Sequence, residues 1–263
     1  MNILDTIIEY KKREVAAAKE KIPVEVLKQA EYFNRNTLSL KQFLLDNSKT
    51  GIIAEFKRRS PSKGVINYRA DVVEITTAYT KHGASCLSVL TDEHFFGGAN
   101  NDLIQARANN IPILRKDFMI DEYQVVEAKA IGADVILLIA ACLPTARIKE
   151  LAVFAKQLSL EVLLEIHNED ELQHICDDIE IVGVNNRDLK TFTVDINRSI
   201  DLGRKIPANK IKIAESGIND VETICILRDA GFKGFLIGEN FMKQPDPTIA
   251  FADFVEQLNA NAK

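Results

Sequence analysis

Acidic and basic side chains follow directly on an apolar run at residues 52–54. Glu55 and Lys57 are two residues apart, so on a strand both side chains would point to the same side. The segment 58–62, Arg-Arg-Ser-Pro-Ser, is cationic and rich in hydroxyl groups, and its proline should end regular strand pairing. An acid and a base beside such a loop suit an anionic ligand, although a solvated charge cluster would have the same composition.

Eight short apolar runs alternate with amphipathic segments after residue 50. The runs begin near residues 52, 85, 111, 134, 160, 180, 211 and 233. The amphipathic segments predict helices over residues 72–82, 102–109, 122–131, 145–157, 169–176, 197–205, 221–230 and 247–258. Strands that are apolar on both faces and alternate with helices indicate a parallel sheet. Eight such units fit an α/β fold of the (β/α)8 TIM barrel type. An open doubly wound sheet would usually have fewer units and a glycine-rich first turn, and neither GxGxxG nor GxxxxGK[ST] occurs.

Residues 1–50 precede the first predicted strand and have helical spacing of apolar residues. We expect helices from about residue 3 to 18, from Pro23 to Leu27, and from Leu38 to Leu45. No low-complexity linker separates these helices from the repeats. The prediction is therefore one (β/α)8 barrel domain over residues 1–263, with residues 1–50 as its N-terminal helical extension.

Composition excludes several classes of function. The net charge is −5 with both signs interspersed, so no nucleic-acid partner is expected. The absence of a long apolar run and of a signal peptide predicts a cytoplasmic protein without a membrane partner. The four cysteines are scattered and should be reduced, and the four histidines lack metal-site spacing, so we expect no metal and no cofactor.

The ends of the predicted strands carry most of the chain's candidate chemistry, because active sites of such barrels lie where strands lead into helices. In chain order the polar ends are Glu55 to Ser60, Thr91 to Gly98, Lys116 to Phe118, Glu165, Asn185 to Asp188, Glu215 to Gly217, and Gly238 to Asn240. Lys116, Glu165 and Glu215 each lie two residues after an apolar strand residue and should point into the barrel. Converging lysines and glutamates would be paired and poised for acid–base work. A purely structural ring of charges is the alternative.

Glycines and aromatic residues add two further predictions. Ser216-Gly217 and Gly238-Glu239 follow strands seven and eight, where such barrels often bind phosphate through backbone N–H groups, and Ser60 could complete that site. Phe95, Phe96 and Phe118 in predicted loops would form a wall for a flat ring, or would only cover core edges.

The motifs AEFKRRSPS, LTDEHFFGG, PILRKDFMID, LLEIH, VGVNNRDL, IAESGI and FLIGENFM, in this order and spacing, resemble those of the indole-3-glycerol-phosphate synthase family over essentially the whole chain. The resemblance implies ring closure, decarboxylation and dehydration of 1-(2-carboxyphenylamino)-1-deoxyribulose 5-phosphate to indole-3-glycerol phosphate, in tryptophan biosynthesis. It implies a small phosphorylated substrate as the partner, and we expect a monomeric chain.

The resemblance also implies residue roles. Lys116 would be the general acid at the substrate ketone, Glu165 the acid–base group of dehydration, and Lys57 the partner of the anthranilate carboxylate. The remaining roles are orientation by Glu55 and Asn185, sugar contacts by Arg187, Glu215 and Ser216, phosphate binding by Ser60, Gly217, Gly238 and the Glu239 backbone, and ring contacts by Phe96 and Phe118. Which lysine acts at which step stays open.

Two residues depart from the family pattern, and two other enzyme classes stay open. Arg115 stands where an apolar residue is expected, and the Glu239 carboxylate would repel a phosphate. A barrel isomerase would be expected to use Cys and Asp at its first and central strand ends, whereas the first strand end here has Glu55 and Lys57. An aldolase would form an imine at a buried lysine. A non-catalytic phosphate binder is the third alternative.

Overall fold

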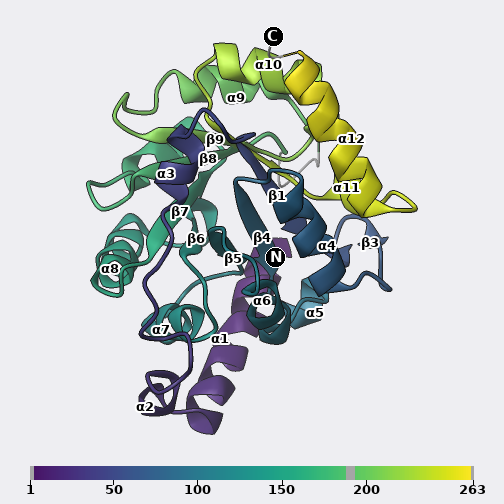
Figure 1. Ribbon diagram of the computed structural model, residues 1–263. Coiled ribbons are helices and arrows are strands. Elements are labelled where there is room, and N and C mark those ends of the chain that lie inside the picture. Colours follow the sequence, from purple (N-terminus) through teal and green to yellow (C-terminus); the bar gives the residue numbers. More distant parts are fainter. Residues whose placement is uncertain (1–2, 188–192, 262–263) are drawn as a thin grey trace.

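Eight parallel strands close into a barrel in the computed structural model, which describes residues 3–187 and 193–261. The strands are β1 (Ile52–Phe56), β4 (Cys86–Leu90), β5 (Ile113–Lys116), β6 (Val135–Ile139), β7 (Glu161–Ile166), β8 (Ile181–Asn185), β9 (Ile211–Glu215) and β10 (Gly234–Ile237). Each strand pairs with the next in this order, and β10 pairs with β1. Figure 1 shows the strands at the centre with helices around them. The predicted TIM barrel is confirmed.

Helices follow the strands and also precede the first one. Before β1 lie α1 (Ile3–Lys21), α2 (Val24–Leu27) and α3 (Leu40–Leu45). The outer helices are α4 (Val72–Lys81), α6 (Asn100–Ala106), α7 (Glu122–Ala130), α8 (Thr145–Gln157), α9 (Ile196–Gly203), α10 (Val221–Asp229) and α12 (Pro247–Ala260). Their bounds agree with the predicted segments to within a few residues. No helix among the described residues is long and apolar enough to cross a membrane.

The alternation of side chains along the strands divides the core into two parts. Ile52, Ala54 and Phe56 of β1 pack in the cluster that includes the surrounding helices. Ile53 belongs instead to the cluster inside the barrel, which Leu40 and Leu44 of α3 also join. Since successive strand residues face opposite sides, Glu55 shares the inward phase of Ile53. Glu55 therefore faces the interior at the carboxyl end of β1, where apolar inward residues give way to a charged one.

Several short elements differ from the predictions. Arg59–Ser60 (β2) and Gly64–Val65 (β3) form a small antiparallel pair on either side of Pro61, which occupies the turn rather than ending all pairing. Residues 169–174 form a 3-10 helix, η2 (Glu169–His174), in place of the expected α-helix. Three short helical turns were not predicted: α5 (Glu93–Phe96), η1 (Ala140–Cys142) and α11 (Glu239–Met242). Phe95 and Phe96 therefore lie on a helix and not in a loop.

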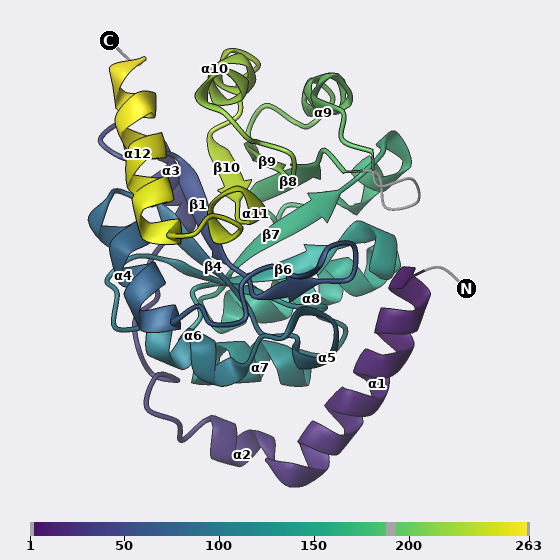
Figure 2. The same cartoon turned by 90° about the vertical axis from the view of Figure 1, so that its right-hand side faces the viewer.

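Helix α1 runs beside the barrel and brings the start of the chain to the barrel mouth. Figure 2 shows α1 as a long purple helix that leads from α2 toward the N-terminus, and in Figure 1 the start of α1 is seen near the β4 and β5 labels. Residues of its first two turns, Ile3, Leu4 and Ile7, line the cavity at the carboxyl ends of the strands. The N-terminal extension is thus part of the site wall.

Candidate active site

A cavity of about 510 Å³ opens at the carboxyl ends of the barrel strands. It is lined by all fourteen residues to which the resemblance gave roles, whereas Phe95, also predicted to wall the site, is not among the lining residues. The fourteen are Glu55, Lys57, Ser60, Phe96, Lys116, Phe118, Glu165, Asn185, Arg187, Glu215, Ser216, Gly217, Gly238 and Glu239. Asp188, also noted at this strand end, lies outside the described residues. Residues from seven strand ends therefore converge on one volume, as the strand phase predicts.

The ammonium group of Lys116 lies between two buried carboxyl groups. Lys116 Nζ is 3.2 Å from Glu165 Oε2 and 3.8 Å from Glu215 Oε2. Burial alone would lower the pKa of Lys116, but the attraction of Glu165, Glu215 and Glu55 outweighs it and raises that pKa above its ordinary value. Lys116 is thus protonated at neutral pH and can donate a proton.

Glu165 and Glu215 have opposite pKa shifts although both are buried. Burial would raise the pKa of Glu165, but Lys116 and His167 lower it overall, and Asn185 Nδ2 donates a hydrogen bond of 3.0 Å to Glu165 Oε1. In contrast, burial and the nearby Glu165 raise the pKa of Glu215 to about 8, and Glu215 Oε1 accepts no hydrogen bond from the described residues. Two carboxyl groups around one lysine therefore divide into an ionised Glu165 and a largely protonated Glu215 at pH 7.

His167 is a site residue that the sequence analysis did not select. Its Nε2 atom lies 3.0 Å from Glu165 Oε1, and its Nδ1 atom lies 3.3 Å from Glu171 Oε2. Although burial lowers the pKa of His167, the two carboxylates raise it to about 9. The imidazole is therefore positively charged at neutral pH and supports the ionised form of Glu165. A buried histidine two residues after an inward glutamate is on the same strand face, and this signal was available in the LLEIH motif.

The first strand end carries a second pair of charges. Lys57 Nζ is 2.5 Å from Glu55 Oε1. A Cβ on Gly238 would lie 2.6 Å from the same Glu55 oxygen, so glycine at the end of β10 leaves room for this carboxylate. Arg58, by contrast, turns away from the cavity and binds Asp102 of α6 through two contacts of 2.5 and 3.0 Å. The cationic first loop contributes Lys63 to the cavity instead of Arg58.

The turn after β9 adopts a conformation that few residues tolerate. Ser216 and Gly217 have φ angles of +68° and +70°. Asn186 Nδ2 donates a hydrogen bond of 2.7 Å to the Ser216 carbonyl oxygen and so stabilises the turn. A Cβ on Gly217 would lie 2.2 Å from Val194 Cγ1, which gives a steric reason for glycine in addition to its φ angle.

Glu239 is paired with cations on both sides. Its Oε2 atom is 3.5 Å from Arg187 Nη2, and its Oε1 atom is 3.8 Å from Lys63 Nζ. These long, partly exposed contacts are weak. The Glu239 carboxylate therefore pairs with two cationic groups that an incoming anion could otherwise contact.

Two phenylalanines, Phe96 and Phe118, form an aromatic wall of the cavity. The ring centroids of Phe96 and Phe118 are 6.0 Å apart and the rings are tilted by 40°. Arg115, the unexpected cation of this strand end, points outward and is 3% exposed, where it binds Glu127 at 2.6 Å and Asp117 at 3.3 Å. Arg115 therefore contacts Asp117, the residue between Lys116 and Phe118, from the outer side of the barrel. No group of three metal-binding side chains occurs within residues 3–187 and 193–261.

Fold and site together define an acid–base enzyme of the TIM-barrel class with space for an aromatic, anionic ligand. A family model described as indole-3-glycerol phosphate synthase matches residues 4–254, and the chain belongs to that family. Indole-3-glycerol phosphate synthase of Bacteroides thetaiotaomicron is 48% identical, over 98% of this chain and 99% of its own. The enzyme of the same name from Polynucleobacter asymbioticus is 44% identical, over 96% and 98% of the two chains.

Solved structures with low sequence identity support the fold alone. The tryptophan synthase alpha subunit of Legionella pneumophila is 13% identical, with a TM-score of 0.62 over 84% of this chain and 97% of its own. A 3-hexulose-6-phosphate synthase is 15% identical, with a TM-score of 0.61 over 80% and 98% of the two chains. Both likenesses agree with the closed barrel described above.

Proposed function

We propose that this chain converts 1-(2-carboxyphenylamino)-1-deoxyribulose 5-phosphate to indole-3-glycerol phosphate, with release of carbon dioxide and water. The observation that carries the proposal is the Lys116–Glu165–Glu215 group at the mouth of a barrel of this family. It places a protonated amine, an ionised carboxylate and a largely neutral carboxyl group within one cavity.

Lys116 acts as the general acid of ring closure. As the ring carbon that bears the carboxyl group attacks the ketone carbon, the ketone oxygen takes a proton from Lys116, so no free alkoxide forms. Loss of carbon dioxide from the ring carbon then restores aromaticity.

Glu165 acts in the dehydration half of the reaction. Its lowered pKa keeps it ionised, so it accepts the proton that must be removed when the hydroxyl group leaves as water. Asn185 holds one of its oxygens, and Lys116 is close to the other. The leaving hydroxyl group takes its proton from a lysine. Besides Lys116, Lys57 is a candidate for this step, and its Nζ atom lies 2.5 Å from Glu55 Oε1.

The remaining residues bind the two ends of the substrate. Phe96 and Phe118 pack on the aromatic ring, and Lys57 pairs with its carboxylate. Arg187 and Ser216 contact the sugar chain. Ser60 and the backbone N–H groups of Gly217, Gly238 and Glu239 bind the phosphate, which the positive φ angles after β9 support.

We also propose that the chain works as a monomer in the cytoplasm. One chain supplies every residue assigned above, and the cysteines are all free thiols, which suits a reducing compartment. Sedimentation equilibrium across a range of concentrations tests the monomer, and a single species of 29.4 kDa is expected.

The growth of indole fluorescence on addition of the substrate tests the reaction, with wild type and Lys116→Ala side by side. We expect growth with wild type and a loss of roughly 10²–10⁴-fold in the variant. No growth with wild type would overturn the proposal. In that case, covalent trapping of a ketose phosphate on the protein by borohydride would indicate an aldolase, because an aldolase forms an imine at a buried lysine. Equal rates in both proteins would keep the reaction and transfer the acid role to Lys57.

A further inference from the structure

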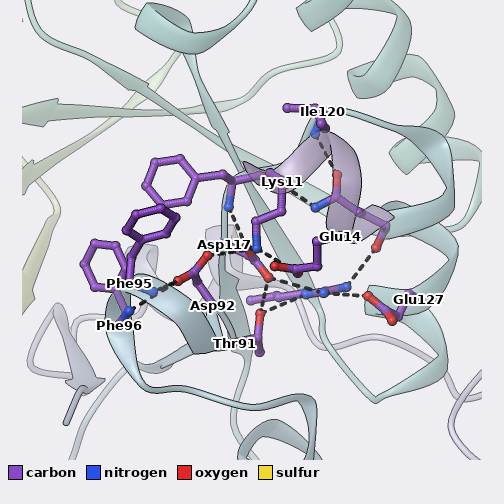
Figure 3. Close-up of polar contacts among 12 residues, drawn as sticks. Lys11, Glu14, Thr91, Asp92, Phe95, Phe96, Asp117, Ile120 and Glu127 are labelled. Carbon is purple, nitrogen blue, oxygen red and sulfur yellow. Dashed lines mark hydrogen bonds and ion pairs between the residues drawn. The ribbon is translucent and has the colours of Figure 1, made fainter. Parts of the chain in front are cut away.

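Lys11 of α1 is a fully buried lysine that the proposed mechanism does not use. Its Nζ atom lies 2.9 Å from each of three carboxylates: Glu14 Oε1, Asp92 Oδ2 and Asp117 Oδ1. Burying an ammonium group is costly unless it is paired, so this cluster fixes the position of α1 relative to the strand ends. Figure 3 shows Lys11 at the centre of these contacts.

Asp92, which follows the end of β4 by two residues, positions Phe96, one of the two residues of the aromatic wall. Its Oδ1 atom accepts hydrogen bonds from the backbone nitrogens of Phe95 at 2.7 Å and Phe96 at 3.2 Å, and so caps α5. Its Oδ2 atom contacts Lys11 and accepts no hydrogen bond from any other described residue. Lys11 therefore neutralises the carboxylate that orients Phe96.

Asp117 positions Phe118, the other residue of the aromatic wall, because it lies between Lys116 and Phe118 in the chain. Its Oδ1 atom contacts Lys11 and accepts a hydrogen bond of 2.8 Å from the Phe118 backbone, and its Oδ2 atom accepts one of 2.6 Å from Thr91. Unlike Asp92, Asp117 has a second cation in Arg115. Burial would raise the pKa of Asp117, but Lys11 and Arg115 lower it to about 2.

The same helix makes further contacts with α5 and with the cavity. Tyr10 stacks on His94 with ring centroids 4.2 Å apart and meets the edge of Phe95 at 5.6 Å. Ile7, one helical turn before Lys11, lines the cavity. Helix α1, the loop after β4 and the loop after β5 are thus joined at one buried cation.

We infer that Lys11 is a positioning residue for the aromatic end of the substrate. By holding Asp92 and Asp117 at the same time, it sets the separation of Phe96 and Phe118. This inference rests on the proposed function. Lys116 is held independently by Glu165 and Glu215, so loss of Lys11 affects ring binding more than proton transfer.

Lys11→Met tests the inference, with Lys12→Met as its control. Lys12 is the next residue of the same helix, its side chain is 59% exposed, and it pairs only with Glu9 among the described residues. In Lys11→Met we expect KM to rise roughly tenfold, with kcat within about threefold of wild type, since a displacement of the wall by less than 1 Å has effects of this size. Lys12→Met should match wild type. An unchanged KM in folded Lys11→Met would overturn the inference.

Asp92→Asn supplies the variant that separates positioning from stability. Asparagine keeps the cap of α5 but removes the charge that Lys11 neutralises. On its own it should raise KM, because it weakens the contact between Lys11 and residue 92. In the Lys11→Met background it should raise KM no further, because that contact is already absent. A purely structural Lys11 would lower the unfolding temperature and leave KM unchanged in all variants. Should Lys11→Met not fold, Asp92→Asn alone gives the comparison, and a KM equal to that of wild type would then contradict the inference.

Wild-type turnover is measured first in the same assay. Failure of the wild type to turn over the substrate contradicts the proposed function. Normal wild-type turnover with unchanged KM in the variants contradicts only the role of Lys11.

Discussion

Gly183 of β8 faces Glu215 of β9 so closely that a Cβ on Gly183 would lie 2.1 Å from Glu215 Oε1. Glycine in the middle of a strand loses backbone entropy and packs poorly, so its presence here needs a reason. The space it leaves is filled by the Glu215 carboxyl group, which reaches across to Lys116. A missing side chain on one strand thus permits a buried acid on the next.

Gly183→Ala should therefore remove most of the activity. The methyl group would force the Glu215 carboxyl group out of its position beside Lys116, and we expect kcat/KM to fall by roughly 10²-fold. The indole fluorescence assay measures this loss. Glu215→Asp in the same chain shortens the side chain, so the double variant should be more stable than Gly183→Ala alone. If Gly183→Ala keeps full activity, the contact does not constrain Glu215.

Glu215→Gln should stabilise the fold at high pH and not at low pH. The pKa of Glu215 is raised from 4.5 to about 8 in the folded protein. Its protonated form is favoured there, so its contribution to stability is complete below pH 4.5 and is lost as pH rises through 8. A neutral glutamine has no such loss.

Thermal unfolding at pH 5 and pH 9 measures this effect. At pH 9 we expect the variant to gain at least about 1 kcal/mol over wild type, a shift of about 2–4 °C in Tm for a domain of this size. At pH 5 the two proteins should differ little. Glu222→Gln, on the exposed face of α10, is the control and should show no dependence of this kind. An equal Tm difference at both pH values would contradict the shifted pKa.

His167→Gln should raise the pH at which Glu165 becomes protonated. The charged imidazole lies 3.0 Å from Glu165 and helps to hold its pKa low. Removing an opposite charge at this distance raises a carboxyl pKa by roughly 1–3 units. The acid limb of the pH profile of kcat/KM should move upward accordingly. His174→Gln is the control, because His174 contacts the carbonyl oxygens of Leu143 and Glu171 instead. An unmoved acid limb would mean that His167 does not act on Glu165.

Glu239→Gln should strengthen phosphate binding. The carboxylate pairs with Arg187 and Lys63, which would otherwise be available to the anion. We expect KM to fall by about two- to fivefold at low ionic strength, and the difference to shrink as salt screens these exposed charges. Inhibition constants of inorganic phosphate measure the same effect without turnover. Glu256→Gln, exposed on α12, should leave both constants unchanged. A rise in KM for Glu239→Gln would show instead that the carboxylate orients Arg187.

Periodicity was sufficient to predict the barrel and the strand ends that carry its site. A period of two makes Lys116, Glu165 and Glu215 share the inward phase of the apolar residues before them, and parallel strands bring their carboxyl ends to one edge. These are local rules, and they located the strand ends before any contact was known. The resemblance to the family then selected the fourteen candidate residues among them. All fourteen line one cavity.

Contacts between residues far apart in the chain decided the rest. The direction of Arg58 toward Asp102, the pairing of Lys11 with Asp92 and Asp117, and the entry of α1 into the cavity wall depend on how loops and helices pack. Which of Glu165 and Glu215 holds a proton depends on burial and on the neighbours of each oxygen. Residue spacing carries no information on either quantity, because hydrogen bonding and desolvation are set by the three-dimensional surroundings of a group and not by its place along a strand.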